Sequence, residues 1–223
     1  MTDKSFELNT GPVPEQERQK LSQSRVFIAG CGGIGGYLLE YMTRAKVGHI
    51  IIADNDSFEE SNLNRQILAD SGNIGQKKVV CAVERALRIC PQTDIQGLDV
   101  YLDSDNLCRL IGGADLVMDA LDNIPSRKAL CEACFKAGIT LAHGAASGWL
   151  AQAAIVSPES RLYDVLYSDK NGQKPAGGVL PFTVAAAASM QSALALGYLC
   201  GGCAENNLHI FDLHTMKMET IQF

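Results

Sequence analysis

A glycine-rich segment, Gly30-Cys-Gly32-Gly-Ile-Gly35, stands between a short apolar run and a segment with helical periodicity. Glycines at this spacing allow a tight turn and let a phosphate group approach the backbone amides at a helix N-terminus. Asp54 ends the next apolar run, where an acidic side chain is placed to hold a ribose hydroxyl. The pattern predicts nucleotide binding and serves NAD and ATP equally well. A glycine turn that only packs helix on strand is the structural alternative.

Further polar residues favour ATP. Asn62 and Arg65 lie in the segment SNLNRQ, and Lys78 ends the segment GQKK. Asp122 comes just after the fourth apolar run, with Arg127 about one helical turn further on. Strand ends of a doubly wound sheet converge on one crevice, and the side chains expected to meet there are Asn62, Arg65, Lys78 and Asp122. A triphosphate that is cleaved needs cations and a carboxylate for Mg²⁺, whereas a dinucleotide needs neither. Taken singly, each residue is equally consistent with a solvated charge or a helix cap.

Apolar runs and helical patterns alternate along the chain. Strands are predicted at 25–29, 49–53, 95–102, 115–118, 139–146 and 150–157, and a closing hairpin at 208–211 and 217–222. Helices are predicted at 34–45, 77–90, 106–111, 126–137 and 180–200. This alternation predicts an α/β fold, a Rossmann-like, doubly wound, mostly parallel sheet with an antiparallel C-terminal extension.

The chain of 223 residues has the length of one domain. Residues 1–23 are polar and broken by prolines, and we expect an arm with a short helix there. Residues 24–223 are predicted to form a single domain. Its polar segment 158–178 is expected to be a crossover loop that orders over the substrate, because long loops of this kind are usually lids or binding segments.

The composition is that of a soluble globular protein, with 47% hydrophobic residues and a net charge of −6. This balance argues against disorder and against a nucleic-acid partner that covers the whole surface. The N-terminus has no apolar stretch typical of a signal peptide, and eight cysteines without such a signal indicate a reducing compartment. We therefore expect a cytoplasmic protein.

The alanine-rich segment 180–200 is long enough to cross a bilayer. It carries polar residues in its middle, however, and Ala185, Ser189, Ala193 and Gly197 recur at every fourth position. Such a face of small residues lets another helix or a sheet come close. A buried core helix or a dimer helix is therefore predicted, and no membrane span.

The order of these motifs resembles the ubiquitin-activating superfamily, and within it the ThiF/MoeB/HesA-like adenylyltransferases. The similarity runs from about Arg25 to the C-terminus, including HGAA at 143–146 and GVLP at 178–181, and SNLNRQ is its most distinctive segment. The resemblance implies that ATP and Mg²⁺ activate the C-terminal Gly-Gly carboxylate of a small ubiquitin-like sulfur carrier. An acyl-adenylate forms and pyrophosphate is released. The usual oligomeric state of the family also implies a homodimer.

The resemblance implies a role for each matching residue. Arg65, Lys78 and Asp122 would be catalytic, the first two stabilising charge on the phosphates and Asp122 binding Mg²⁺. A carboxylate that attacks a phosphate must overcome like-charge repulsion, and it needs no general base because it is already ionised. The positions that would bind the nucleotide are Gly30, Gly32, Gly35, Asp54, Asn62, Arg65 and Lys78.

The N-terminal arm departs from the family pattern. Members usually carry an arginine-rich stretch there that reaches into the partner subunit's active site. This arm offers only Lys4 and Arg18, neither in a matching context. The departure leaves open whether an arm residue completes the partner's site.

Two Cys-x-x-Cys pairs occur, Cys131/Cys134 inside a predicted helix and Cys200/Cys203 in the turn after the alanine-rich helix. Two such pairs normally indicate zinc. The family's zinc pairs lie elsewhere, however, and a pair within a helix is poorly shaped for tetrahedral coordination. We expect buried, small hydrophobic side chains rather than structural zinc or a redox pair. The segment 158–178 contains no cysteine, so an external protein would supply the thiol for any sulfur transfer.

Two single residues each allow two interpretations. His143 lies at a strand end facing the predicted crevice, where it either contacts substrate or is a satisfied structural histidine, and the structural role is favoured. Trp149, the one tryptophan, is interpreted as a packing residue, with carrier contact as the alternative.

Three other functions remain open. A related enzyme would adenylate a carboxylate on a modified tRNA base and cyclise it. An NAD(P)-dependent oxidoreductase would need only the glycine motif and Asp54, and has no use for Arg65, Lys78 and Asp122. A non-catalytic scaffold would keep the fold and bind a carrier. The pathway served, among thiamine, molybdopterin, cysteine or a peptide product, depends on the carrier.

Overall fold

The computed structural model describes residues 9, 11–168, 178–202 and 206–223. Its centre is one eight-stranded sheet with the order β3-β2-β1-β4-β5-β6-β7-β8. Strands β1 to β5 are parallel, and β6, β7 and β8 are antiparallel to their neighbours, which confirms the predicted fold class. The strands are β1 Arg25–Ala29, β2 His49–Ala53, β3 Asp94–Leu98, β4 Leu116–Asp119, β5 Leu141–Ser147, β6 Leu150–Val156, β7 Asn207–Asp212 and β8 Lys217–Gln222.

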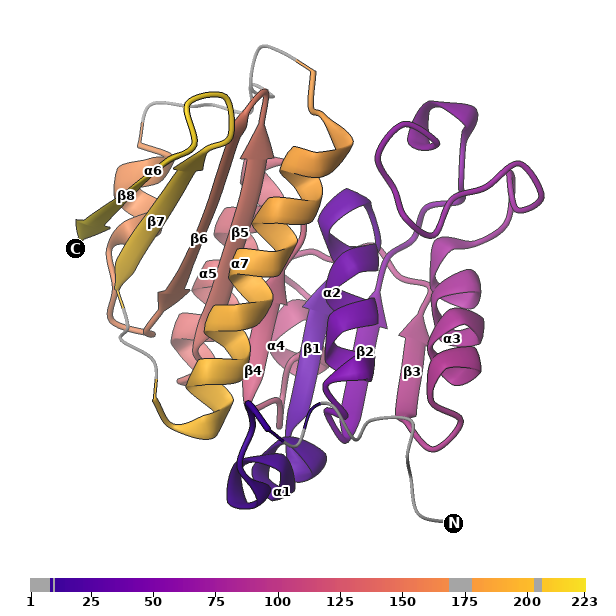
Figure 1. Ribbon diagram of the computed structural model, residues 1–223, viewed down its shortest axis with the longest axis horizontal. Helices are drawn as coiled ribbons and strands as arrows, with labels where there is room; N and C mark the ends of the chain where they lie inside the picture. The colour runs from indigo at the N-terminus through magenta and orange to yellow at the C-terminus, as the bar shows by residue number, and fades with distance from the viewer. Residues whose placement is uncertain (1–8, 10, 169–177, 203–205) are drawn as a thin grey trace.

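Helices cover both faces of the sheet (Figure 1). On one face lie α2 (Gly33–Arg44), α3 (Lys78–Ile89) and α7 (Pro181–Cys200). On the other lie α4 (Leu107–Leu110), α5 (Ile124–Ala137) and α6 (Leu162–Leu166). The arm helix α1 (Glu15–Gln23) packs against α7, and its Leu21 is buried.

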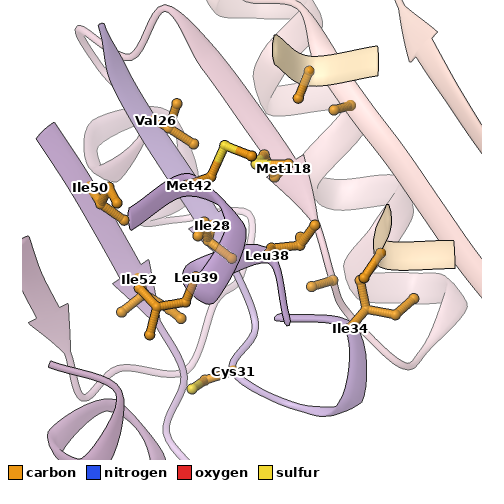
Figure 2. Close-up of a cluster of buried hydrophobic side chains, with 14 of the residues drawn as sticks. Val26, Ile28, Cys31, Ile34, Leu38, Leu39, Met42, Ile50, Ile52 and Met118 are labelled. Carbon is orange, nitrogen blue, oxygen red and sulfur yellow. The ribbon is translucent and has the colours of Figure 1, made fainter. Parts of the chain in front are cut away.

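Side-chain alternation along β1 explains the two layers. Val26 and Ile28 point into the core beneath α2, whereas Phe27 points into the core on the opposite face. Figure 2 shows Leu38 and Met42 of α2 closing over the first of these cores. A parallel sheet buried on both faces requires such continuous apolar strands.

Helix α7 packs against β5, β6 and α2. It has the length and hydropathy of a membrane span, a test that core helices also pass. The predicted face of small residues is not the one against the sheet: Ser189 and Ala193 are exposed, and Ser189 Oγ lies 3.2 Å from Tyr41 Oη of α2. The helix residues that are buried are Thr183, Val184, Ala187, Ala188, Gln191, Ser192 and Ala195.

The prediction is wrong for the segment 158–178 and for the end of the third strand. The segment 158–178 contains α6, whose Leu162 and Tyr163 are buried, because a helix of five residues is too short to show a period in sequence. Residues 169–177 of this segment lie outside the described part. Strand β3 ends at Leu98 rather than at residue 102, since its pairing with β2 ends where Ala53 meets Leu98. Val100, Tyr101 and Leu102, which follow the strand, instead line a cavity at the carboxyl edge of the sheet.

Candidate functional site

A cavity of about 210 Å³ opens at the carboxyl ends of β1, β2 and β4. The strand order reverses between β1 and β4, and ligands of doubly wound sheets bind at such a switch point. The cavity lining brings together most of the nucleotide and metal ligands expected from sequence: Gly30, Gly32, Asp54, Arg65, Lys78 and Asp122.

The three motif glycines are needed for different reasons. A Cβ on Gly30, which has φ +99°, would lie 2.7 Å from the Ala120 carbonyl oxygen, and a Cβ on Gly35 would overlap the Gly30 carbonyl. Both glycines are therefore required by the fold itself. A Cβ on Gly32 would meet no atom closer than Gln66 Nε2 at 3.8 Å. Gly32 lines the cavity, so its missing side chain leaves room for a ligand.

Asp54 ties the ends of β1 and β2 together. Its Oδ2 accepts a hydrogen bond from the Cys31 amide at 2.7 Å, and its Oδ1 accepts one from the Asp56 amide at 2.8 Å. These bonds fix the glycine turn and hold the carboxylate at the cavity wall. The contact with a ribose hydroxyl that was expected for Asp54 needs a carboxylate at this end of β2.

Two cations approach the cavity from different elements. Lys78 begins α3 and is buried, and its Nζ donates to Asp56 Oδ2 at 2.9 Å. Arg65 follows a short 3₁₀ turn, and its Nη1 donates to the Ser61 carbonyl at 3.0 Å and to Asn64 Oδ1 at 2.8 Å. Because both side chains are held in place, their charges are positioned before a ligand arrives.

Gly35 and Asn62 are the two predicted ligands that do not line the cavity. Asn62 is buried, and its Oδ1 accepts a hydrogen bond from the Glu59 amide at 3.0 Å. With Glu59 it forms a capping box around the 3₁₀ turn. In this structure Asn62 shapes the segment that carries Arg65, and its contact with phosphate stays a prediction.

Gln66 is a lining residue that sequence reasoning missed. Its side chain is 6% exposed, and its Oε1 has no hydrogen-bond partner among the described residues. A buried acceptor without a partner is costly, and a ligand hydroxyl or amine in the cavity would satisfy it. The signal was present, because Gln66 closes the SNLNRQ segment.

The turn after β4 carries Asp122. Asp119 Oδ1 accepts a hydrogen bond from the Leu121 amide at 3.0 Å, and Asn123 Oδ1 caps α5 by accepting from the Ser126 amide at 2.9 Å. Asp122 lies between these two anchors, is exposed, and lines the cavity. A carboxylate at this rim has the oxygen chemistry that Mg²⁺ prefers.

Arg127, which follows Asp122 in sequence, does not line the cavity. It lies on the buried side of α5, and its Nη1 donates to Asp119 Oδ2 at 2.8 Å. Burial alone would raise the pKa of Asp119, but the Arg127 charge and a hydrogen bond from Tyr163 lower it instead. The pair is therefore ionised and structural.

His143 has the structural role that was favoured. It is fully buried, its Nδ1 lies 3.0 Å from Tyr163 Oη, and its Nε2 lies 3.2 Å from Gln152 Nε2. Burial lowers the pKa of His143, so the ring is neutral near pH 7. Trp149 is partly exposed, and its ring packs 5.2 Å from both Phe182 and His214.

The first cysteine pair lies within α5 as expected. Burial raises the pKa of Cys131 to about 12 and also raises that of Cys134, so both remain protonated thiols at neutral pH. Cys200 ends α7, and Cys203 lies outside the described residues. Within the described ranges, no three His, Cys, Asp or Glu side chains gather in a metal-binding arrangement.

The N-terminal arm has two cations that were considered from the sequence. Arg18 donates from Nη1 to the Val13 carbonyl, and Lys4 is outside the described part.

Solved structures share this fold. Escherichia coli MccB with AMPCPP and MccA superposes with a TM-score of 0.83 at 18% identity, covering 99% of this chain and 72% of that one. PaaA superposes with a TM-score of 0.80 at 18% identity, covering 94% and 76%. At this identity the likeness concerns the fold alone.

Curated relatives are more similar in sequence. The SAMP-activating enzyme E1 of Haloferax volcanii is 30% identical over 220 residues, covering 94% of this chain and 80% of that enzyme. The ThiS adenylyltransferase of Escherichia coli is 30% identical over 203 residues, covering 87% and 80%. The molybdopterin-synthase adenylyltransferase of Escherichia coli is 39% identical over 129 residues, covering 58% of this chain and 52% of that enzyme.

These relatives are activating enzymes and adenylyltransferases of the E1 type. The family model described as the ThiF family matches residues 6–223, almost the whole chain. The resemblance seen in the motifs is thereby confirmed, and the chain belongs to the ThiF family.

Proposed function

We propose that this protein uses ATP and Mg²⁺ to adenylate the C-terminal glycine carboxylate of a small ubiquitin-like sulfur carrier. The observation that carries the proposal is the cavity at the sheet's switch point, where Lys78 and Arg65 face a glycine turn and Asp122 stands at the rim. Membership of the ThiF family supports it, as do the relatives named for activating ThiS and SAMP.

The residues suit an attack on the α-phosphate. A carboxylate oxygen of the carrier forms a bond to the α-phosphorus while the bond to the β-phosphate bridging oxygen breaks, and pyrophosphate leaves with that electron pair. No proton is transferred. The barrier arises from repulsion between the carboxylate and the negatively charged phosphate oxygens. Lys78 and Arg65 are the cations that line this cavity.

The cavity fits a nucleotide on two counts. The space left by Gly32 lies beside the N-terminus of α2, where phosphate oxygens accept from backbone amides. Gln66 Oε1 is a buried acceptor with no partner among the described residues.

For the metal, Asp122 offers a carboxylate at the rim, and a bound Mg²⁺ would neutralise phosphate charge. Asp54 is less suited as a metal ligand, because both of its oxygens accept backbone amides.

The partners follow from the family. A ubiquitin-like carrier ending in Gly-Gly is the proposed substrate, an external protein supplies the thiol if sulfur is transferred, and the enzyme acts as a homodimer. The oxidoreductase alternative is less well supported, because hydride transfer gives no role to the cations at this cavity. The relatives described above are also adenylyltransferases and an E1.

The test is ATP–pyrophosphate exchange in the presence of purified ubiquitin-like proteins ending in Gly-Gly. Each carrier has a matched control that lacks its terminal glycine and therefore places its carboxylate one residue short. Exchange is expected with one intact carrier and not with its shortened form. Equal exchange with both forms, or without any carrier, would contradict carrier adenylation.

A further inference from the structure

Four side chains meet inside the protein behind the nucleotide cavity. Asp119 ends β4, Arg127 comes from α5, His143 from β5 and Tyr163 from α6, and all four are buried. We call them the buried quartet. They join β4, α5, β5 and α6 to one another, and none of the four side chains lines the nucleotide cavity.

Asp119 is the centre of the quartet. Its Oδ2 accepts hydrogen bonds from Arg127 Nη1 at 2.8 Å and from Tyr163 Oη at 2.5 Å. Tyr163 Oη donates its one proton to Asp119, so its contact of 3.0 Å with His143 Nδ1 requires the proton to be on the histidine nitrogen. His143 Nε2 then accepts from Gln152 Nε2 at 3.2 Å. A single directed chain of hydrogen bonds thus runs from β6 through β5 and α6 to β4.

One end of this chain holds the turn that carries Asp122. While Oδ2 of Asp119 receives Arg127 and Tyr163, its Oδ1 accepts from the Leu121 amide at 3.0 Å, and Leu121 directly precedes Asp122. The Asp119 carbonyl accepts from Gln191 Nε2 of α7 at 3.0 Å. Asp119 is therefore fixed from several sides, and the turn after it has little freedom.

The chain also passes through α6, which lies in the crossover segment 158–178. Tyr163 is the residue of this helix whose hydroxyl reaches Asp119. Tyr167 packs against the Tyr163 ring with centroids 5.4 Å apart and against the His143 ring at 6.4 Å. A polar contact thus connects the crossover segment to the strand end that positions Asp122.

We infer that Asp119 and Tyr163 are positioning residues: the Tyr163 hydroxyl holds the Asp119 carboxylate in the orientation that fixes the 119–123 turn and aims Asp122 at the metal–phosphate site. The inference rests on the proposed function for the role of Asp122. It adds that α6 acts on the nucleotide site through the Tyr163 hydroxyl, rather than through the apolar packing of the helix. Without the hydroxyl, the carboxylate rotates more freely and the Leu121 amide loses its fixed acceptor.

The test compares Tyr163→Phe with Leu162→Ala. The first removes only the hydroxyl, whereas the second removes buried side-chain volume from the neighbouring residue of α6 and leaves all four quartet side chains intact. Two quantities are measured in the full-length protein. One is hydrogen exchange of the peptide spanning 116–126 without nucleotide, and the other is the Mg²⁺ concentration that half-saturates binding of AMPCPP.

Tyr163→Phe is expected to speed exchange in the 116–126 peptide at least about fivefold and to raise the half-saturating Mg²⁺ concentration by a similar factor, as for the loss of one hydrogen bond to a charged group. Leu162→Ala is expected to lower the melting temperature at least as much as Tyr163→Phe does. It should nevertheless leave the exchange rate and the half-saturating Mg²⁺ concentration within about twofold of wild type. Unchanged values in Tyr163→Phe, or equal changes in Leu162→Ala, would overturn the inference. A wild type without Mg²⁺-dependent binding would contradict the proposed function instead, and the exchange data would still decide whether Tyr163 holds the turn.

Discussion

Lys78 Nζ lies 2.9 Å from Asp56 Oδ2, although the lysine side chain is only 6% exposed and the aspartate side chain is 62% exposed. The lysine crosses from the buried start of α3 to a carboxylate at the cavity edge. A buried cation needs a partner, and here that partner is solvated and easily displaced. Incoming phosphate oxygens can therefore take over the lysine without leaving a buried charge unpaired.

Lys78→Met should abolish most of the activity with little loss of fold. Removing one cation aimed at the developing charge of a transition state typically costs about 10²–10³ in rate. Carrier-dependent pyrophosphate exchange measures it. Lys77→Met is the matched control, because Lys77 pairs with Asp99 at 2.9 Å and does not line the cavity. Similar losses in the two variants would contradict the phosphate role of Lys78.

Gly32→Ala should separate binding from folding. Its Cβ would make only an ordinary contact with Gln66, so the melting temperature should change little, while the methyl group occupies space meant for the nucleotide. Gly35→Ala should do the opposite, because its Cβ overlaps the Gly30 carbonyl and the α2–β1 packing must shift. Thermal melts and ATP titration of both variants provide the readout. Wild-type affinity for ATP in the Gly32→Ala variant would show that the nucleotide does not approach this turn.

Gln66→Leu should raise stability and weaken nucleotide binding. The buried Oε1 has no partner among the described residues, so replacing the amide by an apolar side chain of similar size removes a desolvation cost of about 1–3 kcal/mol. A nucleotide group that satisfies this oxygen would lose its partner. We expect a higher melting temperature together with a several-fold weaker affinity for ATP. A variant that is more stable and still binds ATP normally would mean that Gln66 does not contact the ligand.

Much of the fold, and the position of most candidate site residues, could be predicted from local sequence. The eight strands and the major helices follow from apolar alternation and helical period, and the carboxyl-end rule for parallel strands brings Asp54, Lys78 and Asp122 to one cavity from their sequence positions alone. Errors of a few residues at boundaries such as Leu98 arise because pairing, rather than propensity, ends a strand.

The missed features depend on tertiary contacts between elements. Arg127 has the same sequence signal whether it points to the crevice or to Asp119, and only the packing of α5 decides. Tyr163 stands in a polar stretch that gave no sign of burial, yet its hydroxyl reaches a carboxylate 44 residues earlier. Such pairings are set by tertiary structure, which composition and period do not encode.

Acid should destabilise the protein through His143. Burial lowers the pKa of this ring below its usual value of 6.5. Below that pH the unfolded chain therefore binds a proton at His143 that the folded chain does not bind. Stability is therefore full above about pH 6.5 and declines as the pH falls below it. Asp119, whose pKa is lowered from 3.8, adds a further loss in more acidic solution.

Melting temperatures of wild type and His143→Gln between about pH 7.5 and pH 5 test this expectation. The variant should start from a lower melting temperature and show a shallower decline, because the titrating ring has been removed. Parallel declines in the two proteins would assign the acid sensitivity to other groups.

The most direct test of the central claim is the melting temperature with saturating ATP and Mg²⁺, with ATP and EDTA, and with NAD⁺ or NADP⁺, in wild type and Asp122→Asn. A ligand that binds only the folded state at about 100 times its Kd adds roughly 2.7 kcal/mol, which a melt resolves easily. We predict a rise with ATP that requires Mg²⁺ and is lost in Asp122→Asn, with no rise from either dinucleotide. A rise with NAD⁺ or NADP⁺ alone would contradict the adenylating function and make the glycine turn a dinucleotide site.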